Sequence, residues 1–149
     1  MAFLGSLDIS GSALTASRLR MDVISENIAN ATTTRTDAGG PYRRKMVVYH
    51  CADTQADSFG SILHDKMDAA AKVPGGVKVE GIVEDTTPFT TVYDPSHPDA
   101  DENGYVQMPN VDITKETLDM MAVTRAYSAN INAFNAVKNM ASKALELGK

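Results

Sequence analysis

The last third of the chain is predicted to form one uninterrupted helix, and this feature constrains the fold more than any other. Neither proline nor glycine occurs between residues 113 and 147, Asp112 is a favourable N-cap, and Gly148 favours termination. At about 1.5 Å per residue, such a helix is about 50 Å long. A chain of 149 residues is too short to build a core that covers this length.

This predicted helix carries very little charge. Between Arg125 and Lys143 the only charged residue is Lys138, whereas a solvated helix normally has charged residues on its free side. One side carries mainly apolar residues, partly at heptad spacing: Met120, Val123, Tyr127, Ile131, Phe134, Ala141 and Leu145. A second side carries mainly alanine, and a third carries Ser128, Asn132, Asn135, Asn139 and Ser142. The pattern favours burial by other copies or other subunits over burial inside the chain's own domain.

A second amphipathic helix is predicted over residues 8–31. Two sets of residues recur at the spacing of a coiled-coil seam, namely Leu14, Met21 and Ile28, and Ser17, Ile24 and Ala31. Three heptads are equally compatible with a helix that packs in an ordinary core. The helix runs into SENIANATTTRT (residues 25–36), where Asn27 and Asn30 share one face. This small, uncharged polar surface resembles the asparagine side of the C-terminal helix and favours a packed bundle.

The middle of the chain is predicted to be rich in β-structure. Four segments contain strand-forming residues, and turn signals separate them: residues 44–50, 76–84, 88–93 and 104–108. A weak helical signal covers residues 60–72. The predicted fold is therefore α+β, with long terminal helices paired as a coiled-coil-like, tube-forming domain (1–35 and 112–149) and a small β-rich middle domain (36–111) whose segment 50–75 is poorly specified.

Charge and composition exclude several classes of protein. The net charge of −5 resides in residues 43–110, which hold six basic and eleven acidic residues, so a sequence-independent nucleic-acid binder is not expected. No run reaches the roughly 18 apolar residues of a membrane span. No Lys or Arg precedes Arg18, whereas a cleaved secretory signal begins with a basic region. The single cysteine, Cys51, excludes an internal disulfide and is expected to be a half-buried strand residue.

Motifs for catalysis or ligand binding are weak. Acidic residues cluster in YDPSHPDADENGY (93–105), where a structural turn is favoured over a calcium loop because the rest of an EF-hand is missing. No zinc spacing joins His50 and His64, and no nucleotide-binding or nucleophile motif occurs. The basic run YRRK (42–45) is interpreted as a solvated strand edge protected by charge. These motifs therefore predict neither a metal site nor a cofactor.

Several long motifs identify a resemblance. The stretches LDISGSALTASRLRMDVISENIANATTTRT, GGPYRRK, PFTTVYDPSHPDADENGYVQMPNVD and AVTRAYSANINAFNAVKNMASKALELG closely resemble flagellar basal-body rod proteins, and within them a proximal rod subunit. The match covers residues 7–48 and 77–148. The resemblance implies a structural subunit without catalytic activity that polymerises into the wall of a hollow rod, transmits torque from rotor to hook, and encloses the type III export channel.

The resemblance also implies partners, location and site residues. The partners would be other copies, other rod and basal-body proteins and the flagellar export apparatus, without nucleic acid or direct membrane insertion. The chain would lie in the periplasmic rod and be exported without a cleaved signal. The assembly interface would comprise Leu14, Met21, Ile24, Asn27, Ile28, Asn30, Met120, Val123, Tyr127, Ile131, Asn132, Phe134, Asn135 and Val137.

Two competing functions remain open at this point. One is a metal-dependent hydrolase that uses Asp94, His97, Asp99 and Asp101. The other is a monomeric coiled-coil adaptor whose helices bind a soluble partner. Titration with metal ions would test the first, and concentration-dependent ordering of the helices would separate the second from a polymer subunit.

Overall fold

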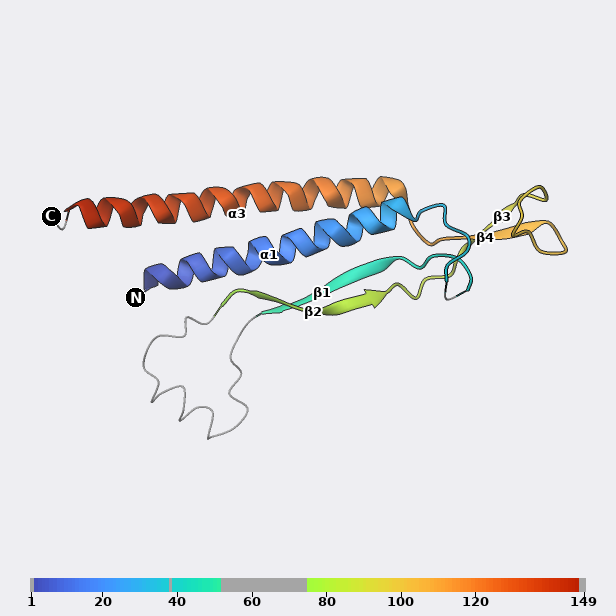
Figure 1. Ribbon diagram of the computed structural model, residues 1–149, viewed down its shortest axis with the longest axis horizontal. Coiled ribbons are helices and arrows are strands. Elements are labelled where there is room, and N and C mark those ends of the chain that lie inside the picture. The colour runs from blue at the N-terminus through green and yellow to red at the C-terminus, as the bar shows by residue number, and fades with distance from the viewer. Residues whose placement is uncertain (1, 38, 52–74, 148–149) are drawn as a thin grey trace, which may run out of the picture. The chain divides into compact units, whose positions relative to one another are not determined.

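The computed structural model describes residues 2–37, 39–51 and 75–147. Along the chain the elements are α1 (Ala2–Ala29), β1 (Lys45–Cys51), β2 (Val77–Glu84), β3 (Thr90–Tyr93), β4 (Tyr105–Met108) and α3 (Ile113–Leu147). Strands β1 and β2 form one two-stranded sheet, and β3 and β4 form another. The α+β class with long terminal helices is therefore confirmed (Figure 1).

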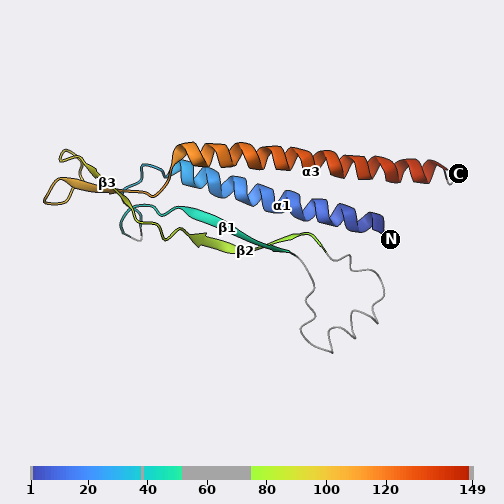
Figure 2. The same cartoon turned by 180° about the vertical axis from the view of Figure 1, so that it is seen from behind.

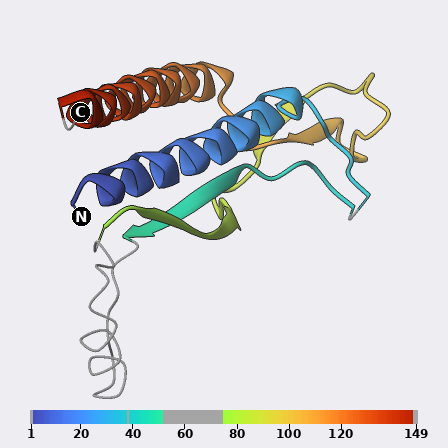
Figure 3. The same cartoon turned by 60° about the vertical axis from the view of Figure 1, so that its left-hand side comes forward.

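The chain forms two compact units, and each is built from segments that are distant in sequence. The first contains Met1–Arg18, Tyr49–Glu80 and Arg125–Lys149, and the second contains Leu19–Val48 and Gly81–Thr124. Helices α1 and α3 and strands β1 and β2 contribute to both units. Within the second unit, α1 lies between α3 and the β1–β2 sheet (Figures 1 and 3). The division into a helical terminal domain and a β-rich middle domain stays a prediction.

Helix α3 has the predicted start, and its N-cap is the predicted residue. The Asp112 carboxylate accepts hydrogen bonds from the backbone N–H groups of Lys115 (3.3 Å) and Thr114 (2.9 Å). These bonds, with that of Lys115 foremost, lower the pKa of Asp112, as expected for a carboxylate that caps a helix. The helix continues to Leu147, and the predicted stop at Gly148 lies outside the described residues.

Helix α1 is longer at its start than the predicted 8–31, since it begins at Ala2, and it ends two residues earlier, at Ala29. At its end the hydrogen bonds shorten to three-residue turns, from Ala31 N to Ile28 O and from Thr33 N to Asn30 O. The run of β-branched threonines that follows disfavours further helix. The Asn30 side chain closes this end by donating to Glu26 O at 2.9 Å.

The four predicted strand segments are confirmed, with shifts of one or two residues at their ends. Strands β3 and β4 are antiparallel, with Thr90 opposite Met108 and Tyr93 opposite Tyr105. Beyond the end of β2, Asp85 N donates to Arg44 O at 2.8 Å, next to the start of β1. The weak helical signal over 60–72 lies outside the described residues. Cys51 ends β1, as expected for a strand residue, but its exposure makes the half-buried prediction wrong.

Few apolar side chains are buried in the described part of the chain. They are Ala16, Val23, Ile24, Tyr42, Val106 and Val123. Large apolar side chains on α3 are instead exposed, among them Leu118 (61%), Met140 (60%) and Leu145 (76%). Figure 2 shows from behind that α1 runs alongside α3. Neither of these helices is long and apolar enough to cross a membrane.

Candidate assembly interface and the polar network behind it

Asn27 is the most completely bonded polar side chain of the second unit. Its amide nitrogen donates to Lys45 O (2.9 Å) and to Glu116 Oε2 (3.1 Å). Its amide oxygen accepts from the Tyr42 hydroxyl and from Lys45 N, both at 2.9 Å. Because these bonds use both donors and both acceptor sites of the amide, the side chain is satisfied although it is only 1% exposed.

Glu116 joins this site to a guanidinium group. Its side chain is 1% exposed, and its Oε1 accepts from Arg44 Nε at 2.6 Å. The same guanidinium lies 3.6 Å from Asp85 Oδ2 and 3.7 Å from Asp119 Oδ2. Asn27, Tyr42, Arg44, Lys45 and Glu116, here named the Asn27 network, thus tie α1 to β1 and to the first turn of α3.

Asn110 extends the connection to the segment between β2 and β3. Its Oδ1 accepts from Arg44 N at 2.8 Å, and its Nδ2 donates to Thr87 Oγ1 at 2.8 Å. Among the described residues, no buried side-chain nitrogen or oxygen lacks a hydrogen-bond partner. A fully satisfied network of this kind specifies one arrangement of its elements, because any shift leaves a buried polar group unpaired.

The surroundings of the network change two pKa values. Burial, followed by the negative charges of Glu26, Glu116 and Glu84, raises the pKa of Tyr42 to about 12. Burial alone would lower the pKa of Arg44, but its hydrogen bond to Glu116 and the nearby carboxylates raise it. Tyr42 is therefore held neutral and Arg44 charged, which are the states that the hydrogen bonds require.

The prediction of a solvated strand edge for YRRK was wrong for Arg44 and Lys45. Both side chains are half-buried and paired with carboxylates, Arg44 with Glu116 and Lys45 with Glu26. The sequence reasoning also missed Glu116 as a site residue. A signal was present, since Glu116 lies seven residues before Val123 and thus places a carboxylate on the predicted apolar seam.

The structure places the predicted interface residues in three settings. Ile24, Asn27 and Val123 are buried; Leu14, Met21, Ile28, Asn30, Met120, Tyr127, Phe134 and Val137 are half-buried; Ile131, Asn132 and Asn135 are exposed. The amide of Asn27 does form an inter-helix hydrogen bond, but within the chain. Asn30 bonds locally, to Glu26 O and to the Thr33 hydroxyl. The role of these residues in assembly stays a prediction.

One side of α3 is exposed along much of the helix. At spacings of three and four residues it presents Leu118, Ala122, Arg125, Ala129, Asn132 and Ala136, all exposed; we name this set the outer face of α3. These side chains are small, apolar or uncharged, apart from Arg125. Such a surface is suited to the close approach of another helix rather than to water.

The acidic loop between β3 and β4 is organised by hydrogen bonds within the chain. Asp94 accepts from the Ser96 hydroxyl (2.6 Å) and from Ser96 N (3.1 Å), and these bonds lower its pKa, the hydroxyl bond most. Asp99 accepts from the Thr34 hydroxyl at 2.8 Å. Across the part of the chain that the structure describes, no three His, Cys, Asp or Glu side chains are arranged to hold a metal ion.

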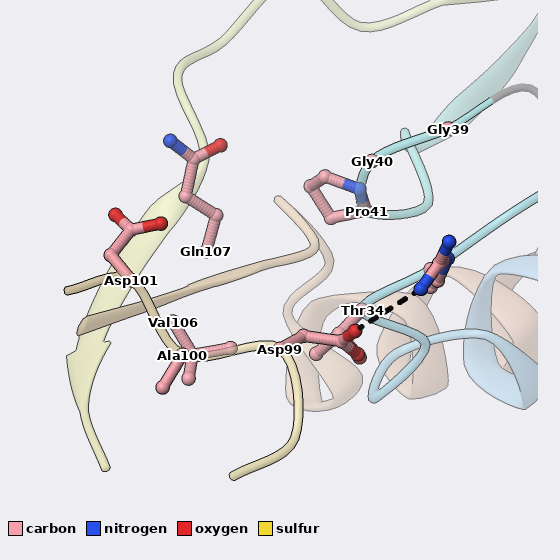
Figure 4. A pocket seen from close by; sticks show the side chains of 10 residues that line it. Thr34, Gly39, Gly40, Pro41, Asp99, Ala100, Asp101, Val106 and Gln107 are labelled. Carbon is pink, nitrogen blue, oxygen red and sulfur yellow. Dashed lines mark hydrogen bonds and ion pairs between the residues drawn. The ribbon is translucent and has the colours of Figure 1, made fainter. Parts of the chain in front are cut away.

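A hollow of about 510 Å³ lies between this loop and residues 34–41. Figure 4 shows Asp99 close to Thr34, whereas Asp101 lies on the other side of the hollow. Asp99 Oδ1 also lies 4.0 Å from Arg35 Nη1. Gly39 and Gly40, with φ of 85° and 80°, form its wall together with Pro41. These left-handed conformations favour glycine, so the turn that anchors the loop depends on this dipeptide.

Comparisons with known proteins agree with this architecture. A family model described as "Flagella basal body rod protein" matches residues 7–35, and one described as "Flagellar basal body rod FlgEFG protein C-terminal" matches residues 102–147. The flagellar basal-body rod protein FlgC of Bacillus subtilis (strain 168) is 50% identical over the whole length of both chains. The proteins of the same name from Salmonella typhimurium (42%, all of each chain) and Borreliella burgdorferi (40%, 99% of this chain and 98% of the other) are also similar.

Proposed function

Because the chain belongs to the FlgC family of flagellar basal-body rod proteins, it is a structural rod subunit, and we propose that it polymerises into a hollow shaft. In this shaft the subunits transmit torque from the rotor to the hook and enclose the type III export channel. Neighbouring copies and other rod proteins bury the exposed sides of α3. The observation that carries the proposal is a 35-residue helix whose exposed sides carry only Lys138 as a charge between Arg125 and Lys143, while few apolar side chains are buried in the described part of the chain.

The proposed interface combines half-buried and exposed residues. Phe134 and Tyr127 lie on the half-buried side of α3, whereas Asn132 and Asn135 are exposed and available to hydrogen-bond to a neighbouring helix. Asparagine at such positions sets the register of packed helices. The helices gain most of their stability from this packing, so we propose that much of α3 becomes ordered on assembly.

We further propose that the chain leaves the cell interior through the flagellar export apparatus without a cleaved signal, and that it acts in the periplasm without catalytic activity. Helices that are completed by neighbours suit a subunit that passes a narrow channel before it folds. Its partners there are other rod and basal-body proteins.

The decisive experiment deletes the gene in the bacterium that makes this chain and restores it with a tagged copy. We expect the deletion strain to be non-motile and to lack rods, and the tagged chain to be recovered in isolated basal bodies at its full, uncleaved length. Hydrogen exchange should show residues 125–147 protected in basal bodies but not in the dilute purified chain. Motile deletion cells, or basal bodies without the tagged chain, would refute the proposal.

The raised pKa of Tyr42 predicts an alkaline limit for rod stability. Because the folded pKa is about 12 and the unfolded value about 10, the neutral phenol stabilises the fold fully below pH 10. This contribution is lost as the pH rises from 10 to 12. The urea concentration that releases half of the chain from isolated basal bodies should fall over this range.

The matched variant is Tyr42→Phe, which removes the titrating group. At pH 8 we expect a lower urea concentration to release half of this variant from basal bodies, because the hydrogen bond from Tyr42 to Asn27 is lost. Above pH 10 this urea concentration should fall less steeply than it does for the unmodified chain. If that urea concentration falls equally steeply above pH 10 for Tyr42→Phe and for the unmodified chain, Tyr42 is not the group whose titration weakens the rod.

A further inference from the structure

The β3–β4 hairpin has an exposed aromatic face that the proposed interface does not use. Tyr93 and Tyr105 stand directly opposite each other in the ladder and therefore point to the same side of it. They are 64% and 46% exposed, and their rings meet edge to face with centroids 5.2 Å apart. With Thr91 and Gln107 they form what we name the tyrosine face. Paired, pre-positioned tyrosines of this kind are typical anchors of protein interfaces.

The other side of the hairpin is already occupied within the chain. Val106, on the opposite side of the ladder from Tyr105, is 2% exposed, and Asp99 binds Thr34 and Arg35 (Figure 4). The hairpin is therefore anchored on one side, and the tyrosine face points outward. An anchored surface loses little conformational entropy on binding.

Within the hairpin segment itself every Asp, Glu, Lys or Arg side chain is acidic, and Arg35 pairs with Asp99 from outside this segment. Between Thr86 and Val111 the chain carries Asp94, Asp99, Asp101 and Glu102 but neither Lys nor Arg. Asp101 and Glu102 are exposed. A partner for this surface must therefore bring positive charge together with apolar or uncharged side chains, and an arginine satisfies both the tyrosine rings and the carboxylates.

The outer face of α3 has this chemistry. Between Met120 and Leu145 the helix has three basic residues, Arg125, Lys138 and Lys143, and no acidic residue. Arg125 lies on the outer face, between the exposed Ala122 and Ala129. A guanidinium flanked by small side chains leaves room for an aromatic surface to approach.

We infer that the tyrosine face of one copy docks on the outer face of α3 of a second copy, with Arg125 against the tyrosine rings and close to Asp101 and Glu102. This inference rests on the proposed function and names a contact between copies within it. Because the two surfaces are different parts of the chain, the contact is heterologous, and repetition of such a contact produces an open helical polymer rather than a closed dimer.

Charge reversal tests the contact in cells that make the tagged chain. Arg125→Glu alone, or Asp101→Arg combined with Glu102→Arg, should lower the amount of chain in basal bodies at least tenfold, since like charges then meet in the interface. Combining all three changes should restore assembly. Lys78→Glu is the matched control, because Lys78 is an exposed basic residue on β2, outside both surfaces, and should leave assembly unchanged.

A second measurement does not depend on the charge variants. In a Cys51→Ser background, Glu102→Cys together with Arg125→Cys should give disulfide-linked species of two or more copies in oxidised basal bodies, and neither single cysteine should do so. Absence of these species overturns the inference, as does normal assembly of Arg125→Glu. Neither result would refute the proposed rod function. That function is tested separately, by the motility of the deletion strain and by the presence of the unmodified tagged chain in basal bodies.

Discussion

Cells whose only copy of the gene encodes Asn27→Leu are expected to be non-motile, with no detectable chain in their basal bodies. The substitution removes four hydrogen bonds from a side chain that is 1% exposed. Glu116 Oε2, the Tyr42 hydroxyl, and the backbone N–H and C=O of Lys45 lose the hydrogen bonds that they make with Asn27. Each buried group that loses its partner costs about 1–3 kcal/mol, and the sum approaches the roughly 5–15 kcal/mol that stabilises a whole protein.

Asn27→Asp tests whether assembly requires the hydrogen bonds of Asn27 or only the space that its side chain fills. The carboxylate has the shape of the amide but no donor, and it would face Glu116, which Asn27 now contacts at 3.1 Å. We expect assembly to fail as completely as with leucine. Thr86→Leu, a polar-to-apolar change at an exposed loop position, should assemble normally. Normal swimming of either Asn27 variant would show that the network is not required for rod assembly.

The second large effect is expected for Phe134→Asp. Phe134 is half-buried on the side of α3 that also carries Tyr127 and Val137, and placing an unpaired carboxylate there costs several kcal/mol. We predict that rods are absent and that the cells do not swim. Ile28→Asp, at a half-buried position on α1, should give the same result.

Thr114→Asp is the control for the added charge. It places a carboxylate at an exposed position in the first turn of the same helix, where the helix dipole favours a negative charge. We expect motility and the amount of chain in basal bodies to stay unchanged. Motility of the Phe134→Asp cells would contradict the assignment of this side of α3 to the assembly core.

The helices and strands could be predicted because the residues that specify each of them are neighbours in the sequence. The absence of proline and glycine after Asp112 fixed the extent of α3, and the cap geometry follows from one carboxylate and two adjacent N–H groups. The strands followed from their composition and from the turn residues between them. The predicted ends of α1 were less accurate, because fraying and short turns at helix ends depend on a few weak hydrogen bonds.

The Asn27 network could not be predicted because its members meet only in three dimensions. Asn27 and Glu116 are 89 residues apart, and Arg44 and Glu116 are 72 apart. From the sequence, Asn27 was one member of a polar surface that was expected to pair between helices, and Arg44 belonged to a basic run expected in solvent. Tertiary structure instead brought them into one buried site.

The sequence by itself therefore determined the class of the fold: two long helices whose sides carry few charges, and an intervening β-rich segment. Periodicity and capping are properties of neighbouring residues, so they can be read along the chain. Only the tertiary structure decided which polar residues the chain keeps for itself and which it leaves exposed. The reason is that burial and hydrogen bonding depend on which distant segments meet, and here α1, β1 and the start of α3 meet at Asn27.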